Sequence, residues 1–367
     1  MAKFKLPSLL AGLFLSLLLP AGEINAAEAP YVSAPAAIVM EMATGQVLYA
    51  KNPDLKRPPA STTKILTAIL ALELSDEQEM VTVSRQAAYT EGASIGLEPG
   101  IQISIGALVR GALISSGNDA TVAIAEHLAG SQENFALLMD RKACLLGAKN
   151  SHFVNPNGLP APDHYSTARD LALMAAYAMQ NPVFRAIVAT KETIIIASDG
   201  ARYLGNTNRL LWSYQGADGV KTGTTNAAGQ CLVASATRNG RQLLSVVLGS
   251  YNRWEDSARL LDYGFEQFYL EQIDSDSSWQ VYVPNGTKNR LLVRPDRTLT
   301  LSLPVVVKPE VERRVFLPAS VRAPIKSGQI LGKICLYCRG QELASVPLVA
   351  GETVEARSFL GRLRPAW

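Results

Sequence analysis

The amino-acid sequence changes its pattern near residue 272, and this change constrains the possible folds more than any other feature. Before it, apolar residues recurring at helical intervals alternate with strand-like runs; after it, from 279 to 350, short β-rich runs alternate with Gly, Pro and Asn turns. The chain has 367 residues, and single cores usually stop growing near about 250–300 residues. Two domains are therefore predicted: an α/β domain over 27–272 and a small all-β domain over 273–350.

Hydrophobic periodicity places the elements of these domains. In the first domain it predicts a hairpin over 37–49, strands over 219–223, 231–236 and 243–249, and helices over 61–73, 105–114, 119–128, 133–146, 167–179 and 254–270. In the second it predicts strands over 281–283, 299–303 and 304–307.

Composition is that of a packed globular protein and indicates no particular partner. Hydrophobic residues make up 48% and charged residues 18%, which excludes a disordered or collagen-like chain. The balance of 35 basic against 32 acidic residues leaves a net charge of +3, too small to argue for nucleic acid. We therefore expect no nucleic-acid partner.

The N-terminus has the plan of a secretory signal peptide. Lys3 and Lys5 precede an apolar run from Leu9 to Leu19, and small residues follow. The run is shorter than the roughly 20 residues that a spanning helix needs, although an uncleaved anchor stays an alternative. Cleavage after Ala26 is expected, with Ala27 and Ala29 as alternative sites. It would place the mature chain in the periplasm or at the outer face of the cytoplasmic membrane.

Cysteine and histidine usage argues against a metal centre. Cys144 and Cys231 lie in apolar surroundings and are expected to be small buried residues. Cys335 and Cys338 form a C-x-x-C in a strand-like run, where they would point to opposite faces; a disulfide is allowed and a zinc half-site is disfavoured. The three histidines show no ligand spacing, so neither a metal nor a cofactor is expected.

Ser61 is the only serine in the chain with a lysine three residues on. On a helix these two positions share a face, so a hydroxyl and an amine would meet at an N-terminus whose dipole favours developing negative charge. Serine needs a base to act as a nucleophile, and Lys64 can be that base only when neutral, as burial and a second cation would make it. A capping serine followed by a solvated lysine is the structural alternative.

Two further short patterns follow at a distance. Ser116-Gly-Asn118 ends one predicted helix and opens another, 55 residues after Ser61, and Lys221-Thr-Gly223 lies on a predicted strand a further 105 residues on. Each is weak alone, because Ser250-Tyr-Asn252 and Lys326-Ser-Gly328 match the same patterns. Order, spacing and structural context together make the set specific.

This motif set resembles that of the D-alanyl-D-alanine carboxypeptidases, the low-molecular-mass penicillin-binding proteins. The resemblance covers nearly the whole chain after the signal, including Asn155-Pro-Asn-Gly-Leu159 and Asp218-Gly-Val-Lys-Thr-Gly-Thr-Thr225. It implies a catalytic domain of the β-lactamase and transpeptidase type, with an antiparallel sheet flanked by helices, followed by a small β-sandwich.

The resemblance also implies a role for each motif residue. Ser61 would attack the carbonyl between the two terminal D-alanines of a peptidoglycan stem peptide, and Lys64 would take its proton. Ser116 would relay a proton to the leaving amine, and the backbone N–H groups of Ser61 and Thr224 would form the oxyanion hole. Asn118 would hold the substrate backbone, and the Lys-Thr-Gly strand would receive the terminal carboxylate through Lys221, Thr222, Gly223 and Thr224. β-Lactam antibiotics would bind in the same way and acylate Ser61.

Two departures from the family pattern stand out. Some members place an arginine between two asparagines ahead of the Lys-Thr-Gly strand, whereas this chain has Thr207, and nothing in the sequence shows whether Arg209 replaces it. The tail, 351–367, is shorter than the amphipathic helix of many members, so it favours weak membrane contact or a frayed end about equally.

Three rival functions share this chemistry or this fold. A class A-like β-lactamase would need a glutamate after the second motif to activate water, and the chain has none between Glu133 and Glu192. A catalytically silent wall-binding protein is disfavoured by the intact motifs. A D,D-endopeptidase or transpeptidase acting on cross-links stays open.

Overall fold

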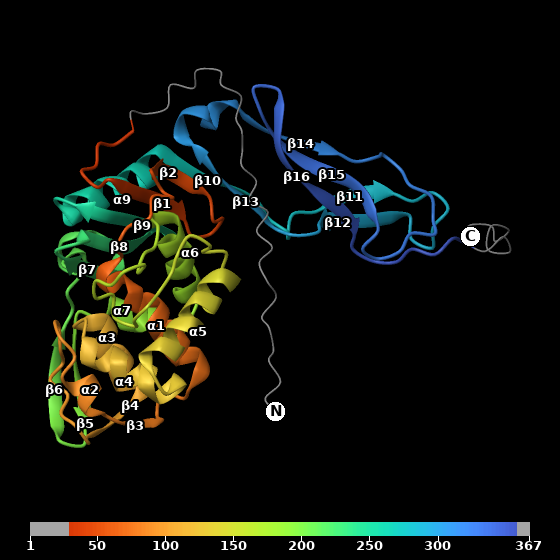
Figure 1. Cartoon of the computed structure of the whole chain (residues 1–367). Coiled ribbons are helices and arrows are strands. Elements are labelled where there is room, and N and C mark those ends of the chain that lie inside the picture. Colours follow the sequence, from red (N-terminus) through yellow and green to blue (C-terminus); the bar gives the residue numbers. More distant parts are fainter. Residues whose placement is uncertain (1–28, 358–367) are drawn as a thin grey trace. The chain divides into compact units, whose positions relative to one another are not determined.

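The computed structural model describes residues 29–357 (Figure 1). These residues divide into two units, and the boundary along the chain lies between Phe265 and Glu266. The predicted signal peptide over 1–26 and the last ten residues of the tail lie outside the described residues.

The first unit contains two antiparallel sheets with most of its helices between them (Figure 1). The larger sheet has the strand order β2-β1-β9-β8-β7 and joins β1 (Ala36–Glu41), β2 (Val47–Lys51), β7 (Ala217–Thr225), β8 (Gly229–Arg238) and β9 (Arg241–Ser250). The smaller joins β3 (Met80–Thr82), β4 (Gln102–Ser104), β5 (Glu192–Ala197) and β6 (Gly200–Gly205). Six successive residues of β8 and six of β9 are buried, because helices cover both faces of the larger sheet.

Nine helices and one 3-10 turn surround or cover these sheets in the part of the first unit that the structure describes. They are the turn η1 (Ala60–Thr63), α1 (Lys64–Leu74), α2 (Arg85–Ala88), α3 (Ile105–Ile114), α4 (Asn118–Ala129), α5 (Gln132–Leu145), α6 (Ala168–Ala178), α7 (Pro182–Ala189), α8 (Leu210–Ser213) and α9 (Arg253–Gln267). Within residues 29–357 no single helix is both long and apolar enough to cross a membrane.

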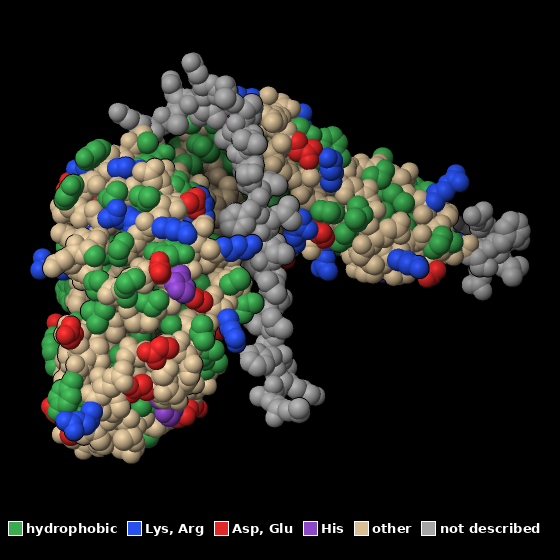
Figure 2. Space-filling view, viewed as in Figure 1, with side chains coloured by type: hydrophobic (Ala, Val, Ile, Leu, Met, Phe, Trp, Pro, Cys, Tyr) green, Lys and Arg blue, Asp and Glu red, His purple; other side chains and the backbone are tan. Residues whose placement is uncertain are grey.

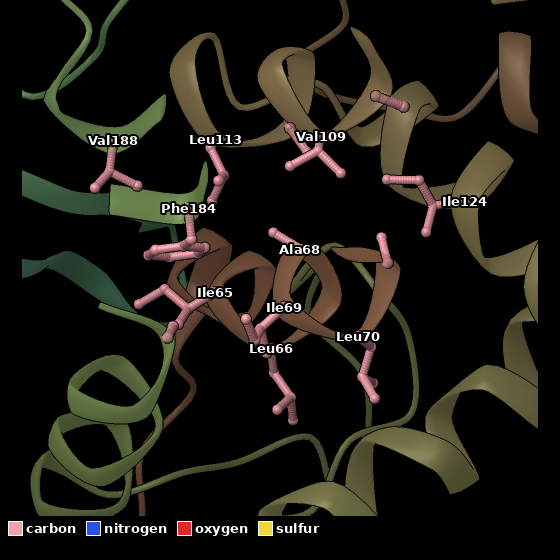
Figure 3. Close-up of a cluster of buried hydrophobic side chains, with 14 of the residues drawn as sticks. Ile65, Leu66, Ala68, Ile69, Leu70, Val109, Leu113, Ile124, Phe184 and Val188 are labelled. Atoms are coloured by element: carbon pink, nitrogen blue, oxygen red, sulfur yellow. The ribbon is translucent and has the colours of Figure 1, made fainter. Parts of the chain in front are cut away.

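Helix α1 lies in the centre of the core. Its first eight residues are all buried, so apolar groups surround it on every side rather than along one stripe. Figure 3 shows Val109, Leu113, Ile124 and Phe184 on neighbouring elements around the aliphatic side chains of α1. Because α1 is held in this way, the position of its first residue, Lys64, is fixed by the packing of the whole unit.

The second unit, as far as it is described, is all-β apart from one 3-10 turn. A five-stranded antiparallel sheet has the order β11-β12-β16-β15-β14, and β10 pairs with β13 in a separate ribbon. The strands are β10 (Phe268–Ile273), β11 (Trp279–Tyr282), β12 (Arg290–Pro295), β13 (Leu299–Pro304), β14 (Val311–Phe316), β15 (Ile330–Cys338) and β16 (Gln341–Ala350). Buried and exposed residues alternate along β12, as in a strand with one face on a core. The predicted architecture, an α/β unit followed by an all-β unit, is confirmed.

Three local predictions are wrong. The closing helix ends at Gln267, not at 270, because the residues from Phe268 pair with β13 as strand β10. The run 304–307 is not a strand: Pro304 ends β13, and Val305–Glu310 forms a 3-10 turn. Cys144 is exposed, since it lies on the outer face near the end of α5, whereas Cys231 is buried as predicted. Cys335 and Cys338 are buried free thiols on β15.

Candidate active site

The 3-10 turn η1 presents Ser61 immediately before α1. The turn is closed by Thr62, whose hydroxyl donates to the Pro59 carbonyl at 2.6 Å, and Ala60 adopts a positive φ of 49°. Ser61 is therefore held by backbone geometry, and Lys64 follows as the first residue of α1. The predicted helix start is present, with its first turn in 3-10 geometry.

The Lys64 amine is fully buried and has three polar neighbours. Its Nζ lies 2.8 Å from Ser61 Oγ, 2.7 Å from Asn118 Oδ1 and 2.9 Å from the Asn157 carbonyl oxygen. The two carbonyl oxygens can only accept hydrogen bonds, while the serine hydroxyl can also donate. A neutral amine satisfies all three, because its two hydrogens go to the carbonyls and its lone pair faces the hydroxyl.

Electrostatics favour this neutral form. Burial, which removes water from the ammonium, lowers the pKa of Lys64 well below its usual value, and the charge of Lys221 lowers it further against an opposing effect of Asp119. The position of Lys64 beside Ser61 and the lowered pKa of its amine are what a base for this hydroxyl requires.

A loop over 154–164 packs against η1, the turn that carries Ser61. Sequence reasoning singled out only Asn155–Leu159 of this loop. The Asn157 carbonyl binds Lys64, and a Cβ on Gly158 would lie 1.9 Å from the Ala60 carbonyl oxygen. His164 Nδ1 accepts from the Val154 N–H at 3.1 Å, which leaves Nε2 to donate to Thr63 Oγ1 at 3.0 Å. Burial lowers the pKa of His164 to about 4, so this contact is made by a neutral ring.

The predicted connector between two helices is present, and its two side chains differ in their contacts. Asn118 begins α4; its Nδ2 donates to the Glu91 carbonyl at 2.6 Å, which turns Oδ1 toward Lys64. Ser116 has a φ of 65° and is 7% exposed. In the part of the chain that the structure describes, its hydroxyl contacts neither Ser61 nor Lys64 through a hydrogen bond.

Strand β7 runs alongside the turn that carries Ser61, as the Lys-Thr-Gly motif predicts. A Cβ on Gly223 would lie 2.9 Å from the Ser61 backbone nitrogen, so only glycine permits this approach. Lys221 is 1% exposed and donates to the Thr222 carbonyl at 3.1 Å. Burial and the neighbouring Arg253 lower the pKa of Lys221 to about 7.

Arg253 is a site residue that sequence reasoning missed. Its guanidinium donates to the Gly223 carbonyl at 2.8 Å and to Thr224 Oγ1 at 2.7 Å, and so it clamps the end of β7. The predicted helix began one residue later, and the only available signal was a cation in the short connection between a strand and that helix. Thr207, at the position where some members have arginine, contacts Thr222 through the two hydroxyls at 2.6 Å.

Two hollows meet at Thr224. The smaller, of about 100 Å³, is lined by Ser61, Gly92, Ala93, Asn118, Asn157, Gly158, Leu159, Thr224 and Thr225. The larger, of about 530 Å³, is lined by Asn206, Thr207, Arg209, Thr224, Gln230, Arg253 and Trp254. No carboxylate side chain is among these lining residues of the described chain. The face in Figure 2 shows acidic and basic side chains intermixed, without a broad basic surface.

Comparisons with known proteins agree with this geometry. The family model described as "D-alanyl-D-alanine carboxypeptidase" matches residues 23–252. The chain belongs to the D-alanyl-D-alanine carboxypeptidase family. Residues 273–356 match the C-terminal domain of penicillin-binding protein 5, which this carboxypeptidase family member therefore shares.

Similar members of the family come from Escherichia coli and Bacillus subtilis. The carboxypeptidase DacC of Escherichia coli is 38% identical over 92% of this chain and 88% of its own length, and DacF of Bacillus subtilis is 35% identical over 90% and 88%. The crystal structure of penicillin binding protein 5 from Haemophilus influenzae has a TM-score of 0.74 at 32% identity, covering 89% of this chain and 99% of that one. The resemblance inferred from the three motifs is thus confirmed.

Proposed function

We propose that the protein is a serine-type D-Ala-D-Ala carboxypeptidase that removes the terminal D-alanine from peptidoglycan stem pentapeptides through an acyl-enzyme on Ser61. The observation that supports this most directly is the 2.8 Å contact between Ser61 Oγ and the buried Lys64 amine, made in surroundings that favour a neutral base.

In the first half of the reaction, Ser61 Oγ attacks the carbonyl carbon between the two D-alanines while Lys64 Nζ takes the hydroxyl proton. The N–H groups of Ser61 and Thr224 face the negative charge that develops on the carbonyl oxygen. The carbon–nitrogen bond then breaks, and the leaving amine receives the proton from Lys64, with Ser116 as the relay. D-Alanine leaves, and Ser61 holds the acyl group.

In the second half, water attacks the ester carbonyl and gives a proton to Lys64, which returns it to Ser61 Oγ. The product is the shortened peptide with a new carboxylate. In a β-lactam the leaving nitrogen stays attached to the acyl group. We therefore propose stable adducts with these antibiotics, because the retained ring blocks the approach of water and the lining residues offer no carboxylate to activate it.

Substrate recognition is assigned to Asn118 and to the Lys-Thr-Gly strand. The ammonium of Lys221 has two further donor positions beyond its bond to Thr222, so it can receive the terminal carboxylate together with Thr222 and Thr224. Gly223 keeps the strand close enough to Ser61 for both ends of the terminal dipeptide to be bound at once.

The two ends of the chain bear on its location and on contact with the membrane. The signal-like residues 1–26 support export to the periplasm or to the outer face of the cytoplasmic membrane, where peptidoglycan is found. Weak membrane contact through the tail stays a proposal, since most of the tail lies outside the described residues. Sequencing the N-terminus of the protein purified from its native envelope tests export: an intact Met1 there contradicts cleavage.

The decisive experiment compares the wild type with Ser61→Ala and with Ser277→Ala, a matched control in the second unit. Each is incubated with a labelled penicillin and with a stem pentapeptide ending in D-Ala-D-Ala. The wild type and the control should form a stable adduct and release D-alanine, and Ser61→Ala should do neither. A persistent adduct in Ser61→Ala would refute the assignment of the nucleophile, and rapid turnover of penicillin would favour the β-lactamase alternative.

A further inference from the structure

The larger hollow continues beyond the position assigned to the terminal carboxylate. Among residues 29–357, Thr224 alone lines both hollows, and Ser61 lines the smaller one. A leaving residue whose α-carboxylate reaches Thr224 would therefore direct its side chain into the larger hollow. The methyl group of D-alanine needs almost none of its 530 Å³, a volume in the range of roughly 300–1,000 Å³ that accommodates drug-sized ligands.

Two guanidiniums line this hollow, and they differ in their contacts. Arg253 donates to the Gly223 and Cys231 carbonyls and to Thr224 Oγ1. Within residues 29–357, the Arg209 side chain has no hydrogen-bond or ion-pair partner, and it is exposed. The two charges are close enough to act on each other: burial lowers the pKa of Arg253, a nearby Cys231 thiolate would raise it, and Arg209 lowers it further.

We propose that the hollow bordered by Arg209 and Arg253 is a subsite for the leaving group that prefers a terminal residue bearing a second carboxylate. This inference rests on the proposed function, because it needs the α-carboxylate to be bound at Thr224. Arg209 is the specificity-determining residue: its guanidinium pairs with the second carboxylate in a bidentate way, while Arg253 stays on the strand. Gln230 and Trp254 line the hollow beside this pair.

Such a leaving group has two chemical sources. One is a stem peptide that ends in a free acidic D-residue. The other is a D,D-cross-link, in which the leaving residue continues through its side chain into a second, acidic stem peptide. Cleavage of either breaks the same amide bond and gives the same acyl-enzyme, with the longer amine as the leaving group.

The test compares stem pentapeptides ending in D-Ala-D-Glu and D-Ala-D-Gln, which differ in charge but hardly in shape, with D-Ala-D-Ala as the reference. The wild type should show a kcat/KM for D-Glu about three- to tenfold above that for D-Gln, the range expected for an exposed but bidentate ion pair. The ratio should fall toward one in 0.5 M salt, because exposed charges are screened.

Arg209→Gln should bring the D-Glu to D-Gln ratio of kcat/KM to about one, whereas Arg185→Gln, at an exposed arginine on α7, should leave the ratio unchanged.

A purified cross-linked dimer distinguishes the two sources of the leaving group. Cleavage that weakens in Arg209→Gln identifies the cross-link, and no cleavage identifies the free acidic terminus. A wild type that releases D-alanine but shows no preference for D-Glu overturns the subsite alone. A wild type that releases no terminal residue from any of the three overturns the proposed function.

Discussion

Two sides of the site, the turn η1 with Lys64 and strand β7 with Lys221, bury a lysine to nearly the same extent. The contacts of each lysine differ in the way that the two proposed tasks, base and carboxylate receptor, require. Lys64 is 0% and Lys221 is 1% exposed. The first has three polar neighbours, two of which can only accept, and the second donates to one carbonyl. The first lysine has little capacity left for a new partner, whereas the second retains donors for an incoming anion.

This difference shows that burial alone does not assign a role to a lysine. Burial lowers the pKa of both, but each also has a different cation beside it: Lys221 acts on Lys64, and Arg253 acts on Lys221. A base must lose its proton before substrate arrives, and a carboxylate receptor must keep or regain its proton when substrate arrives. Substitutions on the two sides of the site should separate these two tasks.

The largest effect is expected from Lys64→Met, which removes the base and leaves a side chain of similar length. Penicillin acylation of Ser61 should slow by about 10³–10⁴-fold, the upper part of the range for loss of a general base. Stopped-flow or quenched mixing with a labelled penicillin measures the rate. Lys149→Met, at an exposed lysine after α5, is the matched control. Near-normal acylation in Lys64→Met would show that another group takes the proton.

Gly158→Ala tests whether the loop over 154–164 positions the turn. The added Cβ would lie 1.9 Å from the Ala60 carbonyl oxygen, so the loop must move away from the nucleophile. We expect a loss of about 3 kcal/mol or more in the free energy of unfolding, measured in urea, together with slower acylation. Gly147→Ala is the control, because Gly147 has a similar φ with open space around it; its loss should be about 1–2 kcal/mol. Equal losses would show that backbone strain alone matters at Gly158.

The elements that could be predicted from the sequence are those whose buried residues form a clear pattern within the element itself. The apolar run after Ser61 gives α1, and the connector at Ser116 and the strand at Lys221 lie between clear periodic segments. The β5–β6 hairpin escaped detection because Ile194 and Ile196 are exposed, so Glu192–Ala197 lacks a simple polar-outward alternation. Phe268 looked helical because the pattern of α9 continues past its end, and pairing with distant Pro304 decides the strand.

The site was predictable where a motif names its residues and not where contacts join distant segments. Ser61, Lys64 and Asn118 come together as their spacing suggested. Arg253 and His164 act through neighbours that lie 29 and 101 residues away in the chain, Thr224 and Thr63, and no local pattern reports such pairs. Asn157 contacts Lys64 through its main-chain carbonyl, so the type of side chain at this position gives no signal of the contact.

A third prediction concerns His164, which must stay neutral on the nucleophile side. Its folded pKa of about 4 lies below the unfolded value of 6.5, so the unfolded chain binds the proton more readily between these values. Stability is therefore fully present above pH 6.5 and falls as the pH drops toward 4, by at most about 3 kcal/mol. Urea unfolding at pH 4–7.5, compared with His164→Gln, isolates this contribution. Identical pH profiles in the two proteins would exclude it.

The smallest effect is expected in the pH dependence of kcat/KM, and it is assigned to Lys221 on strand β7. With a pKa of about 7, Lys221 is protonated below pH 7 and loses its charge as the pH rises. For a pentapeptide with a free terminal carboxylate, kcat/KM should therefore fall about tenfold per pH unit above pH 7.

The same peptide with an amidated terminus should lack this alkaline fall in kcat/KM, because it offers no anion to the ammonium. Lys221→Arg keeps its charge at all these pH values and should remove the alkaline fall for the carboxylate substrate. An equal alkaline fall for both peptides in the wild type would mean that another group titrates there, and that Lys221 holds the strand rather than the substrate.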